Sequence, residues 1–246
     1  MKISIITIVK NNESGVARAL ASVRNQTFNN VEHIIIDGMS TDKTWDIISK
    51  NATDKVISIR ESDNGIYDAI NKGIKLSSGD IIGILHSDDC FFDNHVLEDI
   101  ERIFEENDID LVYGDIIYVS QKNSERVVRK WVAKEYKSKI LQKGWMPPHP
   151  TIFMSSELYK RIGLYDEKYR ISADYKMVLN IFSIPNIAWS YIPRPLVRMS
   201  LGGVSNRNLK SIILKTKEDY QILKECQIGG IYTVLLKNFS KISQFF

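Results

Sequence analysis

Three apolar stretches decide the fold: KISIITIV at residues 2–9, VEHIIID at residues 31–37 and DIIGIL at residues 80–85. Each has the length and composition of a buried β-strand. The residues between them place apolar side chains at helical spacing, as residues 14–24 do after the first strand. This βαβαβαβ alternation over the first 90 residues predicts an α/β fold, in which a mostly parallel, Rossmann-like sheet has helices on both faces.

Polar and acidic side chains follow the strands at the points where the strands end. The segment KNN (residues 10–12) follows the first strand, Asp37-Gly38 closes the second, and HSDD (residues 86–89) follows the fourth. A weaker strand at residues 55–60 is followed by a DNG turn at residues 63–65. Ligands of parallel sheets bind outside the carboxyl ends of the strands. We therefore expect a binding site at this edge.

Two adjacent carboxylates, Asp88 and Asp89, follow the fourth strand. Neighbouring carboxylates are costly unless a cation or hydrogen-bond donors compensate them. Mg²⁺ and Mn²⁺ accept such oxygen ligands and usually share them with substrate phosphates. Taken singly, each of these acids, like Asp37 and Asp63, is equally explained as a turn former or helix cap. Acids at three successive strand ends favour a common site.

The chain beyond residue 90 is predicted to add a helix at residues 94–106 and a strand at residues 111–119. Nine acids and one base lie between residues 93 and 115, and eight bases and two acids lie between residues 120 and 145. Each run is either a solvated face or, for the basic run, a surface that attracts an anionic substrate or lipid headgroup. Further elements are expected at helices near 156–161 and 174–182, and at strands near 187–192 and 196–199.

Composition places the chain among ordinary folded proteins, with 43% hydrophobic and 26% charged residues and a net charge of +3 over 246 residues. This balance does not favour a nucleic-acid partner. The charge is uneven, because residues 207–246 carry seven bases and three acids while residues 1–206 carry a net −1. Aliphatic side chains alternate with the lysines of this tail. We expect it to be helical, lying either on an anionic membrane surface or against the domain.

Several features favour a cytoplasmic protein. Cys90 and Cys226 form neither a CxxC pair nor a disulfide framework, as is typical of a reducing compartment. Residues 1–9 lack the features of a secretory signal. The longest apolar run of the tail, residues 228–236, is about half of what a membrane-spanning helix requires.

Four segments resemble the successive motifs of family 2 glycosyltransferases, which have the GT-A fold, and in particular the bacterial O-antigen, capsule and exopolysaccharide enzymes. The resemblance covers residues 2–205 in the expected order. It implies a nucleotide-sugar-binding half at about 1–115 and an acceptor-side half at about 116–206, and the predicted helical tail at 207–246 lies beyond it. The segments are ITIVKNN (6–12), IIIDGMSTDKTWDII (34–48), SDNGIYDAINKGIKLSSGDIIGILHSDD (62–89) and RISADYKMVLNIF (170–182).

The resemblance also implies a role for each site residue. Asp89 is expected to hold Mn²⁺ or Mg²⁺, which would neutralise the leaving nucleoside diphosphate. Asp174 matches the general base of the family and opens a helix whose N-terminus favours the ionised carboxylate, although a simple helix cap is the alternative. His149, in a loop, and Arg198 and Ser205, near the late Gly-Gly turn, are expected near the diphosphate or the acceptor. The implied nucleotide-binding residues are Thr7, Val9, Asn11, Asp37, Asp63 and Asp88.

These residues together predict an inverting glycosyltransferase that moves a hexose or N-acetylhexosamine from a nucleotide diphosphate sugar, with UDP favoured, to a hydroxyl of a lipid-linked glycan. Its expected place is bacterial surface polysaccharide synthesis at the cytoplasmic face of the inner membrane, as a peripheral protein. The chain has no QxxRW segment, so processive synthesis is not expected. Two alternatives stay open: an inactive nucleotide-sugar-binding or scaffold subunit, and a sugar-phosphate nucleotidyltransferase. The latter needs a Gly-rich, Arg-containing loop where this chain has VKNNESG.

Overall fold

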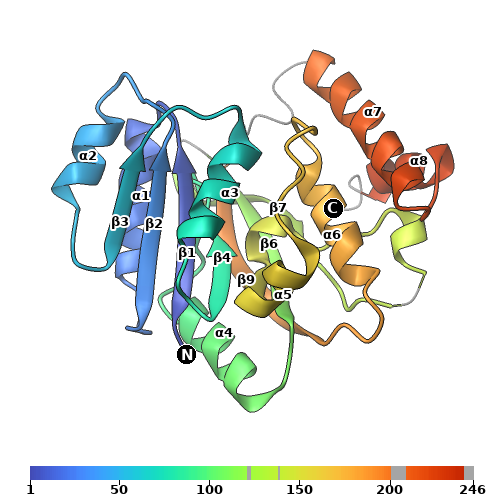
Figure 1. The fold of residues 1–246 in the computed structure, drawn as a ribbon, viewed down its shortest axis with the longest axis horizontal. Coiled ribbons are helices and arrows are strands. Elements are labelled where there is room, and N and C mark those ends of the chain that lie inside the picture. Colours follow the sequence, from blue (N-terminus) through green and yellow to red (C-terminus); the bar gives the residue numbers. More distant parts are fainter. Residues whose placement is uncertain (121–122, 138, 201–208, 241–246) are drawn as a thin grey trace.

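The computed structural model describes residues 1–120, 123–137, 139–200 and 209–240. Within these residues, nine strands form one sheet in the order β3-β2-β1-β4-β8-β6-β9-β5, with β7 paired to β6 (Figure 1). The strands are β1 (Ile3–Val9), β2 (Val31–Asp37), β3 (Val56–Arg60), β4 (Ile81–Ile84), β5 (Cys90–Phe91), β6 (Leu111–Ser120), β7 (Asn123–Trp131), β8 (Phe153–Ser155) and β9 (Trp189–Ser200).

The first four strands pair in parallel, as predicted, and the second half of the sheet is mixed. β1 lies between β2 and β4, and β2 pairs with β3, all in parallel. β6 and β9 are also parallel, whereas β8, β5 and β7 run antiparallel to their neighbours. The predicted α/β architecture is therefore confirmed, and its parallel pairing is concentrated in the first 90 residues, where helices supply the crossovers.

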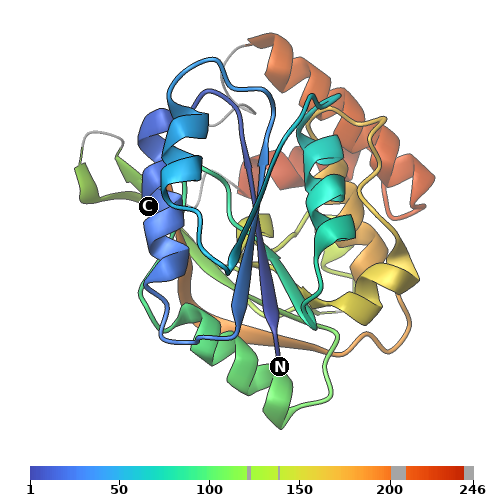
Figure 2. The same ribbon diagram turned by 60° about the vertical axis from the view of Figure 1, so that its left-hand side comes forward.

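Helices cover both faces of the sheet (Figure 2). Alternate residues of β1 explain why: Ile6 and Ile8 pack in the same cluster as α3 and α6, whereas Ile3 and Ile5 pack with α1 and α4. A strand buried on both faces is mostly apolar, and residues 3–9 are apolar at every position except Ser4 and Thr7. The helices are α1 (Glu13–Arg24), α2 (Thr44–Lys50), α3 (Ile66–Leu76), α4 (Val96–Glu106), α5 (Ser156–Ile162), α6 (Ala173–Phe182), α7 (Leu209–Glu225) and α8 (Ile231–Ser240).

The structure differs from the sequence-based prediction in two elements. Residues 187–199 do not form two strands: β9 runs continuously, and a register shift opposite Gly114 and Asp115 accommodates Pro193 and Pro195. The basic run contains β7, which was not expected.

Helices α7 and α8 form a pair beside α6 (Figure 1). Ile222, Leu223 and Val234 are buried and belong to the same core cluster as α3 and α6. Lys237 is also buried and forms an ion pair of 2.9 Å with Asp219. The inner face of this pair is thus part of the packed molecule. No helix within the described ranges is both long and apolar enough to cross a membrane.

Candidate active site

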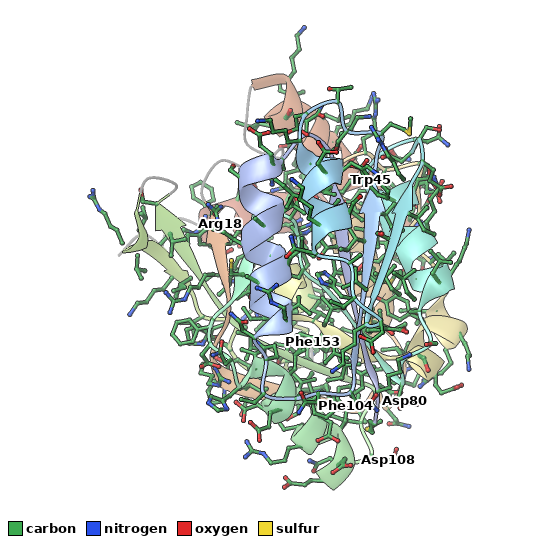
Figure 3. All side chains as sticks on the ribbon, turned by 90° about the vertical axis from the view of Figure 1, so that its left-hand side faces the viewer. Arg18, Trp45, Asp80, Phe104, Asp108 and Phe153 are labelled. Atoms are coloured by element: carbon green, nitrogen blue, oxygen red, sulfur yellow. The ribbon has the colours of Figure 1, made fainter. Side chains whose placement is uncertain are left out.

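The carboxyl ends of the parallel strands gather at one edge of the molecule. In Figure 3, Trp45 of α2 lies near this upper edge, whereas Asp80, just before β4, and Asp108, after α4, lie at the opposite end. The loops after β1, β2, β3 and β4 therefore meet at the upper edge, as the parallel order requires.

Asn11 and Asn12 connect the loop after β1 to two others. Asn11 has φ 52°, a left-handed conformation that asparagine tolerates, and its backbone N–H donates to Ser40 Oγ at 2.9 Å. Its side-chain oxygen accepts from the Thr41 N–H at 2.7 Å. Asn12 caps α1 and donates from Nδ2 to Ser87 Oγ at 3.1 Å. The loops after β1, β2 and β4 are thereby held together.

Asp37 and Asp63 also meet at this edge. Asp37 is fully buried, accepts from the backbone and hydroxyl of Ser40 and lies 3.4 Å from Arg60 Nε. A Cβ on Gly38 would lie 2.2 Å from Asp63 Oδ2. Only glycine allows this approach without moving the Asp63 carboxylate, so the Asp37-Gly38 turn and the turn after β3 are packed against each other.

Asp88 and Asp89 lie between this group and β9. Asp89 is completely buried, and its Oδ1 accepts from the Ser200 N–H at 3.2 Å. Its Oδ2 is buried and has no hydrogen-bond partner within the described part of the chain. Burial raises the pKa of Asp89 well above its ordinary value, and the neighbouring Asp88 carboxylate acts in the same direction. The Asp88 backbone carbonyl accepts from the Ser200 hydroxyl at 2.9 Å.

Asp174 lies in the first turn of α6, in contact with two histidines. His149 Nδ1 is 3.1 Å from Asp174 Oδ2, and His149 Nε2 is 3.3 Å from His86 Nε2. One arrangement of ring protons satisfies both contacts: His86 donates to His149, and His149 donates to Asp174. His86 directly precedes the Ser-Asp-Asp segment, so this chain joins Asp174 to the loop that carries Asp88 and Asp89.

The surroundings of Asp174 favour its ionised form. Burial alone would raise its pKa, but His149, Lys237 and the backbone N–H of Tyr175, which donates to Oδ1 at 2.8 Å, together lower it. The Tyr67 hydroxyl lies 3.3 Å from the same oxygen. Burial lowers the pKa of His149 to about 4, against the pull of Asp174, so the ring is neutral at pH 7. Asp174 is therefore a carboxylate with donors around it, as a general base requires.

The loop before α6 is held by the C-terminal helices. The Glu218 carboxylate of α7 accepts from the backbone N–H groups of Arg170, Ile171 and Ser172 at 2.9, 3.0 and 2.9 Å. The Tyr67 hydroxyl of α3 donates to the Ile171 carbonyl at 2.6 Å. Asp174 follows this loop directly, so its position depends on α7 as well as on α3.

The remaining residues predicted for the site are placed differently. Thr7 is fully buried, and its hydroxyl lies 2.8 Å from His33 Nε2. Val9 is the last residue of β1, and its carbonyl accepts from the Gly38 N–H at 2.9 Å. Arg198 of β9 donates to the Phe92 carbonyl at 3.1 Å and lies over the Phe92 ring. Ser205 and the adjoining Gly-Gly turn are outside the described residues.

Sequence reasoning missed several residues of this site. His86 and Tyr67 lie within the segments that carry the family resemblance, so their position in those motifs was the available signal. Glu218 and Lys237 belong to the tail, where nothing in the local pattern indicates a contact with residues 170–175. Lys237 Nζ lies 3.1 Å from the centre of the Tyr175 ring, next to Asp174.

A divalent cation fits this edge at Asp89. Its oxygen without a partner is what a cation would satisfy, and a buried carboxylate is a hard oxygen ligand suited to Mg²⁺ or Mn²⁺. Among the described residues, no group of three or more His, Cys, Asp or Glu side chains forms a complete cage. Mg²⁺ commonly uses only one or two carboxylates together with substrate phosphates and water.

Comparison with known proteins identifies the family. The model of glycosyl transferase family 2 matches residues 4–164, and the chain belongs to this family. A PGL/p-HBAD biosynthesis glycosyltransferase of Mycobacterium bovis is 30% identical over 217 residues, covering 86% of this chain and 82% of that protein. An uncharacterized glycosyltransferase of Mycobacterium tuberculosis is 32% identical over 179 residues, covering 72% and 67%. The chain is therefore a glycosyltransferase.

Solved structures show the same fold. S. aureus TarS in complex with UDP-GlcNAc matches with a TM-score of 0.72 and 19% identity, over 93% of this chain and 66% of that chain. The mannosyltransferase PcManGT of Pyrobaculum calidifontis, in complex with GDP-Man and Mn²⁺, matches with a TM-score of 0.64 and 15% identity, over 96% and 69%. The predicted GT-A fold is confirmed.

Proposed function

We propose that this glycosyltransferase inverts the anomeric centre of its donor sugar in one displacement, with Asp174 as the base. The observation that supports this most directly is the environment of Asp174. Its carboxylate is surrounded by the Tyr175 N–H, the Tyr67 hydroxyl and His149, and its pKa is lowered despite burial. A binding protein or scaffold has no need of an ionised carboxylate held in this way.

The reaction would involve one bond made and one bond broken. The acceptor hydroxyl oxygen attacks the anomeric carbon, the bond from that carbon to the diphosphate oxygen breaks, and the nucleoside diphosphate leaves with the electron pair. Asp174 takes the proton of the acceptor hydroxyl. His149, through its contact with Asp174, orients the carboxylate and places the acceptor side of the site next to the loop of Asp88.

We propose that Mn²⁺ or Mg²⁺ assists this transfer and that Asp89 is the side chain that would hold it. When bound, a divalent cation supplies positive charge that stabilises the leaving diphosphate. Asp88 would lie near the ribose. Asn11, Asp37 and Asp63 would bind the nucleoside with the backbone around Thr7 and Val9, and Arg198 and Ser205 would lie near the diphosphate or acceptor.

We favour a UDP-sugar as donor, with transfer of a hexose or N-acetylhexosamine. The UDP-GlcNAc bound by TarS, a protein of the same fold, supports this choice. The acceptor would be a lipid-linked glycan of bacterial surface polysaccharide synthesis, at the cytoplasmic face of the inner membrane. Residues 207–246 would then make peripheral contact with anionic lipid through the surface that α7 and α8 turn away from the domain of residues 1–206.

The test of this function is Asp174→Asn, assayed by nucleotide release from a panel of UDP-, GDP- and dTDP-sugars with a hydroxyl acceptor. Turnover should fall by about 100-fold to 10,000-fold, because the base is lost. Donor affinity, measured by calorimetry, should change little, because Asp174 faces the acceptor. Asp166→Asn, just upstream on the surface of the same region, is the matched control. Undiminished turnover of Asp174→Asn would refute the base assignment.

Metal dependence is tested in the same assay. EDTA should abolish turnover, and added Mn²⁺ or Mg²⁺ should restore it. Full turnover in EDTA would remove the role proposed for Asp89. If nucleotide sugars bind but no variant or condition reveals transfer, the alternative of an inactive binding subunit would be favoured.

A further inference from the structure

Helix α8 differs from an ordinary surface helix, because its exposed face is apolar and its buried face includes a lysine. Its inner face buries Thr233, Val234 and Lys237, and the lysine is neutralised by the ion pair with Asp219. Its outer face exposes four large apolar side chains and carries no charged residue between them. These are Ile231 (61% exposed), Tyr232 (70%), Leu235 (48%) and Phe239 (64%).

Helix α7 continues this surface with alternating apolar and basic side chains. Ile213, Lys217, Tyr220 and Lys224 follow one another at helical spacing, and all four are exposed. A Cβ on Gly230 would lie 4.0 Å from Lys224 Cε, so this stripe ends beside the beginning of α8. We call Ile213, Lys217, Tyr220, Lys224 and the four apolar residues of α8 the outer α7–α8 face.

The charge that this pair of helices presents to solvent is positive. Each acid in its described part has a partner: Glu218 accepts three backbone N–H groups, Asp219 pairs with Lys237, and Glu225 pairs with Lys168 and Lys176. Lys217 and Lys224 are exposed beside the apolar residues. The surface thus combines apolar side chains with basic residues and lacks an exposed unpaired carboxylate among the described residues.

We propose that the outer α7–α8 face docks on an anionic lipid bilayer. Apolar side chains inserted to the level of the acyl boundary, with lysines at the level of the headgroups, are the pattern of an interfacial helix. Each lysine near an anionic surface adds attraction that falls off within a Debye length. The inference rests on the proposed function in one respect: a lipid-linked acceptor would explain why the enzyme docks on a bilayer. The observations on the outer α7–α8 face do not depend on which reaction the enzyme catalyses.

The test is flotation of the full chain with vesicles of phosphatidylcholine alone or mixed with phosphatidylglycerol. The protein should float with the mixed vesicles and much less with phosphatidylcholine alone. Leu235→Ser should lower the partition coefficient by up to roughly tenfold, since burial of one such side chain is worth about that factor. Because these factors multiply, Ile231→Ser/Leu235→Ser/Phe239→Ser should lower it by roughly 100-fold or more. Leu164→Ser, at a comparably exposed leucine on another surface, should bind as the unchanged protein does.

Charge is tested separately. Lys217→Glu/Lys224→Glu should abolish the preference for phosphatidylglycerol, and Lys50→Glu, on α2, is its control.

Deletion of residues 207–246 is a poor test, because it would also remove Glu218 and Lys237 from the neighbourhood of Asp174. Circular dichroism and melting curves establish that the variants are folded. Nucleotide release without vesicles should be unchanged in all of them, which separates failure of docking from failure of the proposed transfer reaction.

Two results would overturn the proposal. In one, the triple variant floats as the unchanged protein does. In the other, the unchanged protein stays with the buffer in the presence of anionic vesicles and light scattering shows a dimer that the triple variant lacks. The second result would assign the outer α7–α8 face to contact between two copies of the chain.

Discussion

A buried carboxylate and a half-buried one, at the same edge of the sheet, have their pKa values shifted in opposite directions. Asp89 has one hydrogen-bonded and one unpartnered oxygen next to Asp88, and its pKa is raised. Asp174 is surrounded by a backbone N–H, a hydroxyl and a histidine, and its pKa is lowered. Environments that separate the pKa values of two acids assign them different tasks. These opposite shifts fit the roles proposed for the two residues, Asp89 as a cation ligand and Asp174 as a base.

Asp89→Asn should leave the folding stability intact while removing the stabilisation by Mn²⁺ and nucleotide sugar. Without a cation, an amide replaces a buried carboxylate that lacks a partner, so the free energy of unfolding should stay the same or rise by about 1 kcal/mol. The increase in melting temperature caused by Mn²⁺ plus nucleotide sugar should disappear, because the ligand oxygen is lost. Thermal melts with and without Mn²⁺ measure both effects. The exposed Asp46→Asn is the control, and a strongly destabilised Asp89→Asn would contradict this reading.

At the scale of elements, the loop that precedes Asp174 is held by helices that are distant in the sequence. Residues 170–172 are held by Glu218 of α7 and Tyr67 of α3, and both elements pack on α6 through the same core cluster. A displacement of about 1 Å at a catalytic group can cost a large factor in rate. The C-terminal helices are therefore positioning elements for Asp174 and not only an appendage.

Glu218→Gln should lower kcat by roughly tenfold to 100-fold while changing the KM of the nucleotide sugar little. An amide has a single acceptor oxygen and cannot satisfy the three N–H groups that the carboxylate accepts. Glu225→Gln, on the same helix but in an exposed ion pair, is the control. Steady-state kinetics with varied donor and acceptor give the separation of kcat from KM. Equal changes in both parameters, or none, would contradict a positioning role.

At the scale of the whole molecule, one carboxylate joins three segments at the end of the sheet opposite the site. Glu32 of β2 accepts from Ser4 Oγ, from the backbone N–H and hydroxyl of Ser78 and from Lys2 Nζ. It thereby links β2 to β1 and to the turn before β4. Burial alone would raise the pKa of Glu32, but these donors outweigh it and lower the pKa to about 2.

This shift predicts the direction of acid sensitivity. Because the pKa of Glu32 is lower in the folded state, its contribution is complete above the ordinary pKa of about 4.5 and is lost as the pH falls towards about 2. Glu32→Gln should therefore be less stable than the unchanged protein by about 2 kcal/mol at pH 7. The difference should shrink as the pH falls through that window. Urea unfolding across this pH range measures it, with exposed Glu157→Gln as control; a constant difference would contradict the assignment.

Much of the fold follows from local pattern. Residues 3–9 are apolar at five of seven positions and residues 34–36 at all three, which favours strands buried on both faces, and the alternation with helices implies their parallel order. That order brings Asn11, Asp37 and Asp89 to one edge, as predicted. By contrast, β7 is a polar strand of a hairpin, and its sequence carries no such pattern.

The sequence by itself determined the α/β class, the parallel first half of the sheet and the edge at which the acids gather, because each depends on the periodicity of apolar residues within a few turns or strands. The tertiary structure alone decided which distant side chains complete the site. The contacts of His86 with His149 and of Glu218 with residues 170–172 join segments 46 to 63 residues apart. Such contacts depend on the relative placement of helices and loops in the packed molecule, and the spacing of residues within one element does not determine that placement.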